Sequence, residues 1–188
     1  MRAQIAASIK LMFCIRKIRF LALLVQTLAL CVSGNAQQPK LRAELFTPKT
    51  VEPINAAEFR QLLAHYQGKV VLVNLWATWC APCLKELPEL AKLQEQYRDK
   101  GLHVLTVTID EPEILETRVK KVWRDRAAGL PAYLQTEVTP DKFVSLIDPS
   151  WAEIMPTNFV LDREGKLKAT LTGGKTLAEF EAAIRPLL

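Results

Sequence analysis

Val70-Val71-Leu72-Val73-Asn74-Leu75-Trp76 runs directly into Ala77-Thr78-Trp79-Cys80-Ala81-Pro82-Cys83, and these two stretches decide the fold. The first is a nearly continuous apolar run, which is typical of a strand covered on both faces of a sheet. Residues 84–97 then carry apolar side chains at helical spacing. The sequence therefore predicts a buried strand, a short turn that holds two cysteines, and an amphipathic helix.

The Cys80-Ala81-Pro82-Cys83 pair is expected at the N-terminus of that helix. Free backbone N–H groups and the helix dipole stabilise a thiolate at such a position. A thiolate is the form of cysteine that attacks disulfides. A Cys-x-x-Cys pair between a strand and a helix therefore indicates a redox pair.

A zinc site and a purely structural disulfide are the alternatives for these two cysteines. Zinc needs four protein ligands, or three in a catalytic site. The other two cysteines, Cys14 and Cys31, lie near the start of the chain, in a segment that is expected to be removed. The two histidines, His65 and His103, lie in different segments and lack the spacing of a zinc site. A structural disulfide between cysteines so close in sequence would close a very small loop and stabilise little. The pattern favours redox chemistry and predicts no metal.

Residues 76–83, followed by Leu84-Lys85-Glu86-Leu87-Pro88, resemble the thioredoxin-like proteins of the TlpA/ResA type. Residues 155–166, Met-Pro-Thr-Asn-Phe-Val-Leu-Asp-Arg-Glu-Gly-Lys, look like that family's cis-proline segment, its next strand and the turn after it. The resemblance covers about residues 53–188. It implies a thioredoxin-like fold and a thiol:disulfide oxidoreductase.

Three residues are expected to be catalytic. Cys80 is the candidate nucleophile, and Cys83, one turn into the helix, is the candidate resolving thiol. Glu86 occupies the place of an acidic residue near the active site of the resembled family, where it would raise the thiol pKa and carry a proton. Asn74 stands where ordinary thioredoxins have a buried acid, which strengthens the case for Glu86. The alternative is an ordinary helix glutamate near the surface.

Five further residues are expected to form the substrate-binding surface. Trp79 flanks the cysteines, and Ala81 and Pro82 between them supply no positive charge, so we expect a reducing or intermediate potential. The resemblance implies a cis peptide between Met155 and Pro156, which would expose the Met155 backbone to a partner. The alternative is a trans proline that ends a loop.

The N-terminus has the order of a secretory signal peptide. Residues 1–19 contain five basic residues and no acid, residues 20–32 are apolar apart from two polar side chains, and Gly34-Asn35-Ala36 offers a cleavage site. The alternatives are an uncleaved membrane anchor, lipidation of Cys31, and a start at Met12. The chain has 25 basic and 20 acidic residues, so cleavage after Ala36 leaves a neutral protein and gives no indication of nucleic-acid binding.

The rest of the chain is expected to form a linker, residues 37–52, and one thioredoxin-like domain, residues 53–188. Helical and strand patterns alternate and end in a hairpin and a helix, with the expected helices and strands at residues 56–66, 70–75, 84–97, 102–109, 110–128, 132–134, 139–147, 157–161, 167–171 and 176–187. This order predicts an α/β sandwich with a central mixed β-sheet and helices on both faces.

The sequence thus predicts an exported, periplasmic thiol:disulfide oxidoreductase, cleaved or anchored to the inner membrane. By resemblance, it would reduce disulfides of partner proteins, as in cytochrome c maturation, and take electrons from a membrane thiol carrier. It would need no small-molecule cofactor beyond the Cys80–Cys83 pair and bind no nucleic acid. The alternatives are a disulfide oxidase or isomerase, and a non-catalytic module of the same fold that binds a metal or a peptide.

Overall fold

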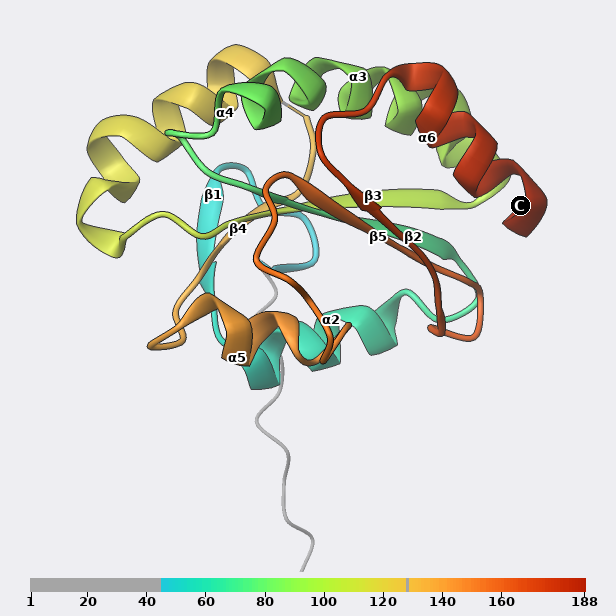
Figure 1. Cartoon of the computed structure of the whole chain (residues 1–188), viewed down its shortest axis with the longest axis horizontal. Coiled ribbons are helices and arrows are strands. Elements are labelled where there is room, and N and C mark those ends of the chain that lie inside the picture. The colour runs from blue at the N-terminus through green and yellow to red at the C-terminus, as the bar shows by residue number, and fades with distance from the viewer. Residues whose placement is uncertain (1–44, 128) are drawn as a thin grey trace, which may run out of the picture. The chain divides into compact units, whose positions relative to one another are not determined.

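A six-stranded sheet lies between two layers of helices in the computed structural model, which describes residues 45–127 and 129–188 (Figure 1). The strands are β1 (Val51–Ile54), β2 (Val70–Trp76), β3 (Leu102–Thr108), β4 (Ala132–Gln135), β5 (Thr157–Leu161) and β6 (Leu167–Thr172). The α-helices are α2 (Ala56–His65), α3 (Ala81–Tyr97), α4 (Lys120–Arg126), α5 (Pro140–Val144) and α6 (Leu177–Ile184).

The strand order is β1-β4-β3-β2-β5-β6. The first four strands are parallel, whereas β5 pairs antiparallel with β2 and with β6. α2 and α5 cover one face of the sheet, and α3, α4 and α6 cover the other (Figure 1). The prediction of a mixed sheet with helices on both faces is confirmed.

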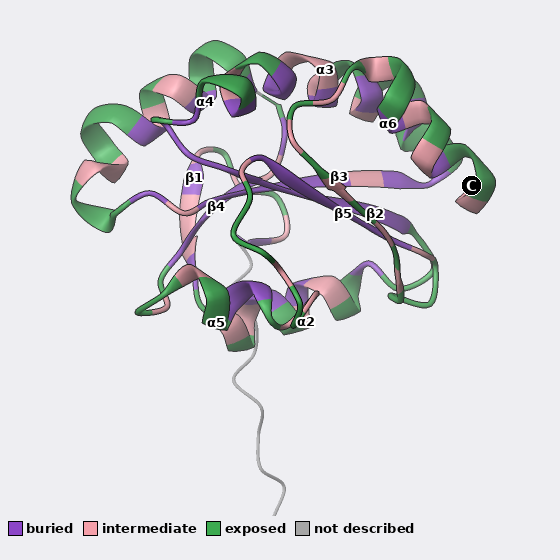
Figure 2. Ribbon diagram, viewed as in Figure 1, coloured by how far each residue is buried: buried purple, intermediate pink, exposed green. Residues whose placement is uncertain are grey.

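β2 is the central strand, and all seven of its residues are buried (Figure 2). Because successive side chains of a strand point to opposite faces, β2 contributes to two cores. Leu72 and Trp76 pack with the helices α3, α4 and α6, while Val73 and Leu75 pack with α2 and α5. Asn74 is the one polar residue of this strand, and it lies on the α3 face together with Leu72 and Trp76.

The expected linker, residues 37–52, extends too far toward the C-terminus. Val51 and Ile54 are fully buried in β1, which pairs with β4 at the edge of the sheet. Leu45 is also fully buried, and its carbonyl accepts a hydrogen bond of 2.6 Å from the Tyr133 hydroxyl. The prolines of this segment gave it the composition of a linker, but spaced apolar side chains fix its described part, residues 45–52, to the core.

Two helices also differ from the prediction. The redox helix α3 begins at Ala81 rather than residue 84, so Pro82 lies within its first turn. The expected helix over residues 110–128 is divided into a 3-10 turn, Pro112–Ile114, a π-helical turn, Leu115–Val119, and the short α4. Val119 and Trp123 are the buried residues of these three helical pieces.

In the part of the chain that the structure describes, the first half of β3 has no strand beside it on the β4 side, because β4 pairs with β3 only from Thr106 to Thr108. A side chain of α3 occupies this edge instead. The Gln94 carboxamide donates to the Leu102 carbonyl at 3.2 Å and accepts from the Val104 N–H at 2.6 Å. Gln94 thereby satisfies the backbone groups that a neighbouring strand would otherwise pair with.

The expected signal peptide, residues 1–36, and the linker as far as residue 44 lie outside the described residues, as do Cys14 and Cys31. Within the described ranges, no helix has the length and apolar character needed to cross a membrane.

Candidate active site

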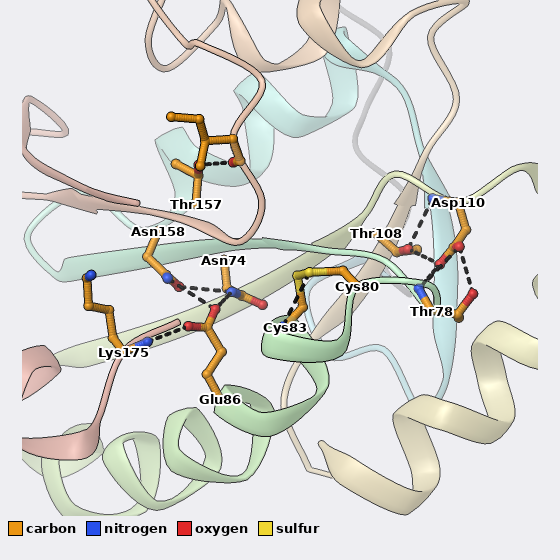
Figure 3. The surroundings of a disulfide bond; sticks show 11 residues. Asn74, Thr78, Cys80, Cys83, Glu86, Thr108, Asp110, Thr157, Asn158 and Lys175 are labelled. Atoms are coloured by element: carbon orange, nitrogen blue, oxygen red, sulfur yellow. Dashed lines mark hydrogen bonds between the residues drawn. A yellow bond between two sulfur atoms is a disulfide. The ribbon is translucent and has the colours of Figure 1, made fainter. Parts of the chain in front are cut away.

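Cys80 and Cys83 form a disulfide at the start of α3 (Figure 3). Cys80 is the N-cap of the helix, in an extended conformation, and Cys83 lies in the first turn, with 5.2 Å between the two Cα atoms. The loop before the helix is turned back by a hydrogen bond of 3.1 Å from the Cys80 N–H to the Ala77 carbonyl. The cysteines thus stand where the sequence places them, between β2 and α3.

The two sulfur positions are not equivalent. Cys80 is 5% exposed, whereas Cys83 is fully buried. The Cys83 backbone N–H points at the Cys80 sulfur, at an N–S distance of 3.3 Å. A donor in this position, together with the helix dipole, favours negative charge on Cys80 once the disulfide is opened.

Ala81 and Pro82, between the cysteines, are exposed on the first turn of α3. Pro82 requires no hydrogen bond at this position, because the first N–H groups of a helix have no partner within it. The loop between β6 and α6 lies against Pro82. A Cβ added to Gly174 would stand 3.4 Å from the Pro82 Cβ, so a side chain there would crowd the redox turn.

Trp79, directly before Cys80, is 62% exposed. The peptide bond between Met155 and Pro156 is cis, as the resemblance implies. Leu75 of β2 pairs with Thr157 of β5, so Pro156 lies at the end of β2 from which the cysteine loop departs. Among the described residues, the Met155 backbone forms no hydrogen bond.

Glu86 is only 2% exposed, so the alternative of an ordinary helix glutamate near the surface is wrong. Its Oε1 accepts hydrogen bonds from the side-chain amides of Asn74, at 2.8 Å, and Asn158, at 3.2 Å. Its Oε2 accepts one from the Lys175 backbone N–H at 3.1 Å (Figure 3). These partners come from β2, β5 and the loop before α6, so three distant segments converge on one carboxylate.

Burial raises the pKa of Glu86 to about 6, although the hydrogen bonds from Asn158, Lys175 and Asn74 oppose the rise. A carboxyl group with this pKa is poised to exchange a proton near neutral pH. A cleft of about 410 Å³ borders Glu86 and gives solvent a route to it. The residues lining the cleft are Pro82, Lys85, Glu86, Glu89, Gly174, Lys175 and Thr176.

Asn158 and Lys175 were not expected at the site. Asn158 pairs directly with Asn74 across β2 and β5, and both side chains are fully buried. A polar residue within the apolar run of β5, two positions after the proline of the cis segment, was a signal for Asn158. Lys175 contributes its backbone N–H, for which the sequence carries no signal.

Asp110 is a second buried carboxyl group that the sequence analysis missed. It is 3% exposed and accepts hydrogen bonds from the Thr78 N–H, at 2.9 Å, and from the hydroxyls of Thr78, at 2.8 Å, and Thr108, at 2.6 Å. Figure 3 shows this cluster on the opposite side of the disulfide from Glu86. Asp110 thereby fixes the backbone two residues before Cys80.

Asp110 had a signal in the sequence. It is an acid that follows the apolar run of β3, and the carboxyl ends of parallel neighbours such as β2 and β3 meet at one edge of a sheet. The arrangement as a whole can exchange disulfides. It combines a disulfide at a helix N-terminus, one slightly exposed sulfur, a nearby carboxyl group of raised pKa, and a neighbouring surface with an exposed indole.

A model of the Redoxin family matches residues 55–184 of this chain. The thiol-disulfide oxidoreductase ResA of Bacillus cereus is 30% identical over 125 residues, which are 66% of this chain and 67% of that protein. The protein of the same name from Geobacillus thermodenitrificans is 28% identical over 169 residues, with 85% of this chain and 92% of that protein covered.

A solved structure of a thioredoxin family thiol:disulfide interchange protein from Chlorobium tepidum is similar to this chain with a TM-score of 0.57 and 24% sequence identity. The match covers 66% of this chain and 83% of that one. The expected thioredoxin-like fold is confirmed.

Replacing Glu86 by Gln should change how the stability of the oxidised protein depends on pH. The folded wild type holds the Glu86 proton up to about pH 6, whereas in the unfolded chain the pKa is near 4.5. The wild type therefore loses about 2 kcal/mol of unfolding free energy as the pH rises through this interval, and Glu86→Gln does not. Urea unfolding of both proteins at about pH 4 and pH 7.5 measures the difference. If the unfolding free energies of the two proteins differed by the same amount at both pH values, a raised pKa of the buried Glu86 carboxyl would be contradicted.

Asp110→Ala should lower the unfolding free energy by about 3 kcal/mol, because it leaves the Thr78 N–H and two threonine hydroxyls without an acceptor. Asp125, an exposed helix residue paired with Lys121 at 2.7 Å, provides the control. Asp125→Ala should unfold at the urea concentration of the wild type. Equal midpoints for the two variants would show that Asp110 does not hold the loop.

Proposed function

Because this chain belongs to the Redoxin family and is a thiol-disulfide oxidoreductase of the ResA type, we propose that it is exported and reduces disulfides of periplasmic partner proteins. Cytochrome c maturation, in which cysteines must be kept reduced, is the proposed setting. The observation that carries the proposal is the Cys80–Cys83 disulfide at the N-terminus of α3, with its less buried sulfur beside the exposed Trp79.

The reaction begins with the dithiol form, in which the Cys80 thiolate attacks a partner's disulfide. A bond forms between the Cys80 sulfur and one partner sulfur, and the other partner sulfur leaves as a thiolate. Cys80 takes this role because it caps the helix and is the less buried cysteine. The N–H of Cys83 supports the negative charge before the attack.

Cys83 completes the exchange. Its sulfur attacks Cys80, which breaks the mixed disulfide, releases the reduced partner and restores the Cys80–Cys83 disulfide. The first helical turn holds both sulfurs together, which gives this second step a high effective concentration. Cys83 must lose its proton to attack, and Glu86, one turn further along α3 and with a pKa of about 6, is the proposed acceptor.

Partner proteins are proposed to dock on the surface around the disulfide. Trp79 and Ile154 are 62% and 48% exposed, and they are large apolar side chains on the two segments that flank the site. Ala81 and Pro82, which follow Trp79 on the redox turn, are also exposed. The Met155 backbone, which has no hydrogen bond to any described residue, suits pairing with an extended segment of the partner.

The reducing direction is supported by the charges near the sulfurs. Ala81 and Pro82 add no positive charge, and the buried acids Glu86 and Asp110 lie on either side of the disulfide. Negative charge nearby disfavours thiolates and so works against an oxidising potential. Each turnover consumes two electrons, for which we propose a membrane thiol carrier as donor; no metal or small-molecule cofactor is needed.

Export is proposed from the basic, apolar and small-residue order of residues 1–36. After residue 36 the chain has no cysteines other than Cys80 and Cys83. A single Cys-x-x-Cys pair in an oxidising compartment favours redox chemistry over structural disulfide bonding, which fits export. The mature protein would be free in the periplasm, or held at the inner membrane by an uncleaved segment or by lipid on Cys31.

Cys83→Ser should accumulate mixed disulfides with partner proteins through Cys80, because the resolving thiol is missing. Cys80→Ser should accumulate few, since the buried Cys83 does not reach a partner. Non-reducing gels of cells that express each variant measure the adducts, and Cys80→Ser/Cys83→Ser gives the background. Adducts in equal amount from both single variants would overturn the assignment of roles.

The redox potential should lie nearer the ~−270 mV of thioredoxin than the ~−120 mV of a strong periplasmic oxidant. Equilibration with dithiothreitol or glutathione buffers, followed by thiol trapping, gives the value. A potential above roughly −150 mV would favour the oxidase alternative instead.

A further inference from the structure

Asn74 has one hydrogen-bonding atom that the oxidised structure leaves without a partner. Its side chain is fully buried in the centre of the sheet. Its Nδ2 donates to Glu86 Oε1 at 2.8 Å and to Asn158 Oδ1 at 2.9 Å. Its Oδ1 has no partner among the described residues, although a buried polar atom without one is costly and needs an explanation.

The orphan oxygen is on the side of the redox pair. Asn74 faces α3, and α3 presents Cys83 and, one turn later, Glu86 to this face of β2. Figure 3 shows the Asn74 amide between the Glu86 carboxylate and the disulfide. In Figure 3 the Nδ2 end of the amide points to Glu86 and the Oδ1 end points toward the cysteines.

The oxidised cysteines offer this oxygen no donor, because a disulfide carries no hydrogen on sulfur. Reduction by two electrons and two protons breaks the S–S bond and forms two S–H groups. The new Cys83 S–H is a donor, and Cys83 is fully buried away from water. Reduction therefore creates a buried donor on the side of β2 to which the unpaired acceptor is turned.

We propose that Asn74 Oδ1 accepts a hydrogen bond from the Cys83 thiol in the reduced protein, so that Asn74 is a positioning residue that favours the dithiol. The inference rests on the proposed function in that the Cys80–Cys83 pair must cycle between disulfide and dithiol. It assigns Asn74 a role that depends on redox state. The oxidised form bears an unsatisfied oxygen, and the reduced form satisfies it.

The two ends of this one amide then serve the two halves of the reaction. Oδ1 keeps the proton on Cys83 while Cys80 attacks the partner, because an amide oxygen accepts a hydrogen bond but does not take the proton at neutral pH. Nδ2 holds the Glu86 carboxylate in place to receive that proton when Cys83 attacks in turn. A carboxylate in place of Asn74 could accept the Cys83 proton itself and has no N–H group to hold Glu86, so one side chain could no longer serve the two steps separately.

The first test compares Asn74→Leu with Asn158→Leu in the full-length protein. Both remove a buried amide that donates to Glu86 Oε1, but Asn158 Oδ1 already has a partner in the oxidised state. In dithiothreitol buffers, Asn74→Leu should shift the equilibrium toward the disulfide about fivefold, as the loss of one ordinary hydrogen bond does. Asn158→Leu should shift it less than twofold.

Equal shifts in the two variants would overturn the role of Asn74, as would a shift of Asn74→Leu toward the dithiol. A backbone carbonyl of the preceding helical turn is the competing acceptor for Cys83, and it would produce equal shifts. A wild-type pair that dithiothreitol does not reduce would overturn the proposed function as well, which separates the two failures.

A second measurement needs no substitution and so does not depend on the folding of Asn74→Leu. Carbon NMR of the wild type with labelled asparagine side chains reports the Cγ resonances of Asn74 and Asn158. Reduction should move the Asn74 resonance more than that of Asn158, because only Asn74 gains a donor. A movement of Asn158 as large as that of Asn74 would contradict the hydrogen bond.

Discussion

The pairing of β2 with both β3 and β5 is the constraint on which the other features depend. It makes β2 a central strand whose two faces are covered by helices, and the alternation of its side chains then turns Asn74 toward α3. β3 runs parallel to β2, so its carboxyl end brings Asp110 to Thr78. β5 runs antiparallel, so its start brings the cis Met155–Pro156 peptide to the same edge. The cysteine loop leaves β2 at this edge, where Thr78 binds Asp110.

The buried polar groups behind the redox pair lower the free energy of unfolding unless their hydrogen bonds are made. Asn74, Asn158 and Glu86 are removed from water, and only their hydrogen bonds to one another and to Lys175 make this tolerable. Apolar residues of similar size would pack there without these requirements. Their presence ties the α3 turn that holds Cys83 to β2, β5 and the loop before α6, so a change at any of these segments reaches the redox pair.

The sequence is informative where a residue's neighbours in the fold are also its neighbours in the chain. The buried strand, the redox turn and the closing helix follow from local patterns. The cis proline required a family resemblance, because cis bonds are rare even before proline. The burial of Glu86 depends on strand order, which no local pattern contains, and the acid after the apolar run of β3 indicates Asp110 only once β2 and β3 are known to be parallel neighbours. β1 was missed because prolines obscured two buried side chains that pair with a strand eighty residues away.

Gln94 limits where another polypeptide chain can add a strand to this sheet. The exposed edge of a sheet invites an extended polypeptide to add itself as a further strand, whether it belongs to a client or to an aggregating copy. The carboxamide of Gln94 already occupies the free backbone groups of Leu102 and Val104. The bare edge of β3 is therefore closed to a further strand, whereas the Met155 backbone forms no hydrogen bond among the described residues. In the docking mode proposed above, an extended partner segment would pair with the Met155 backbone and not with β3.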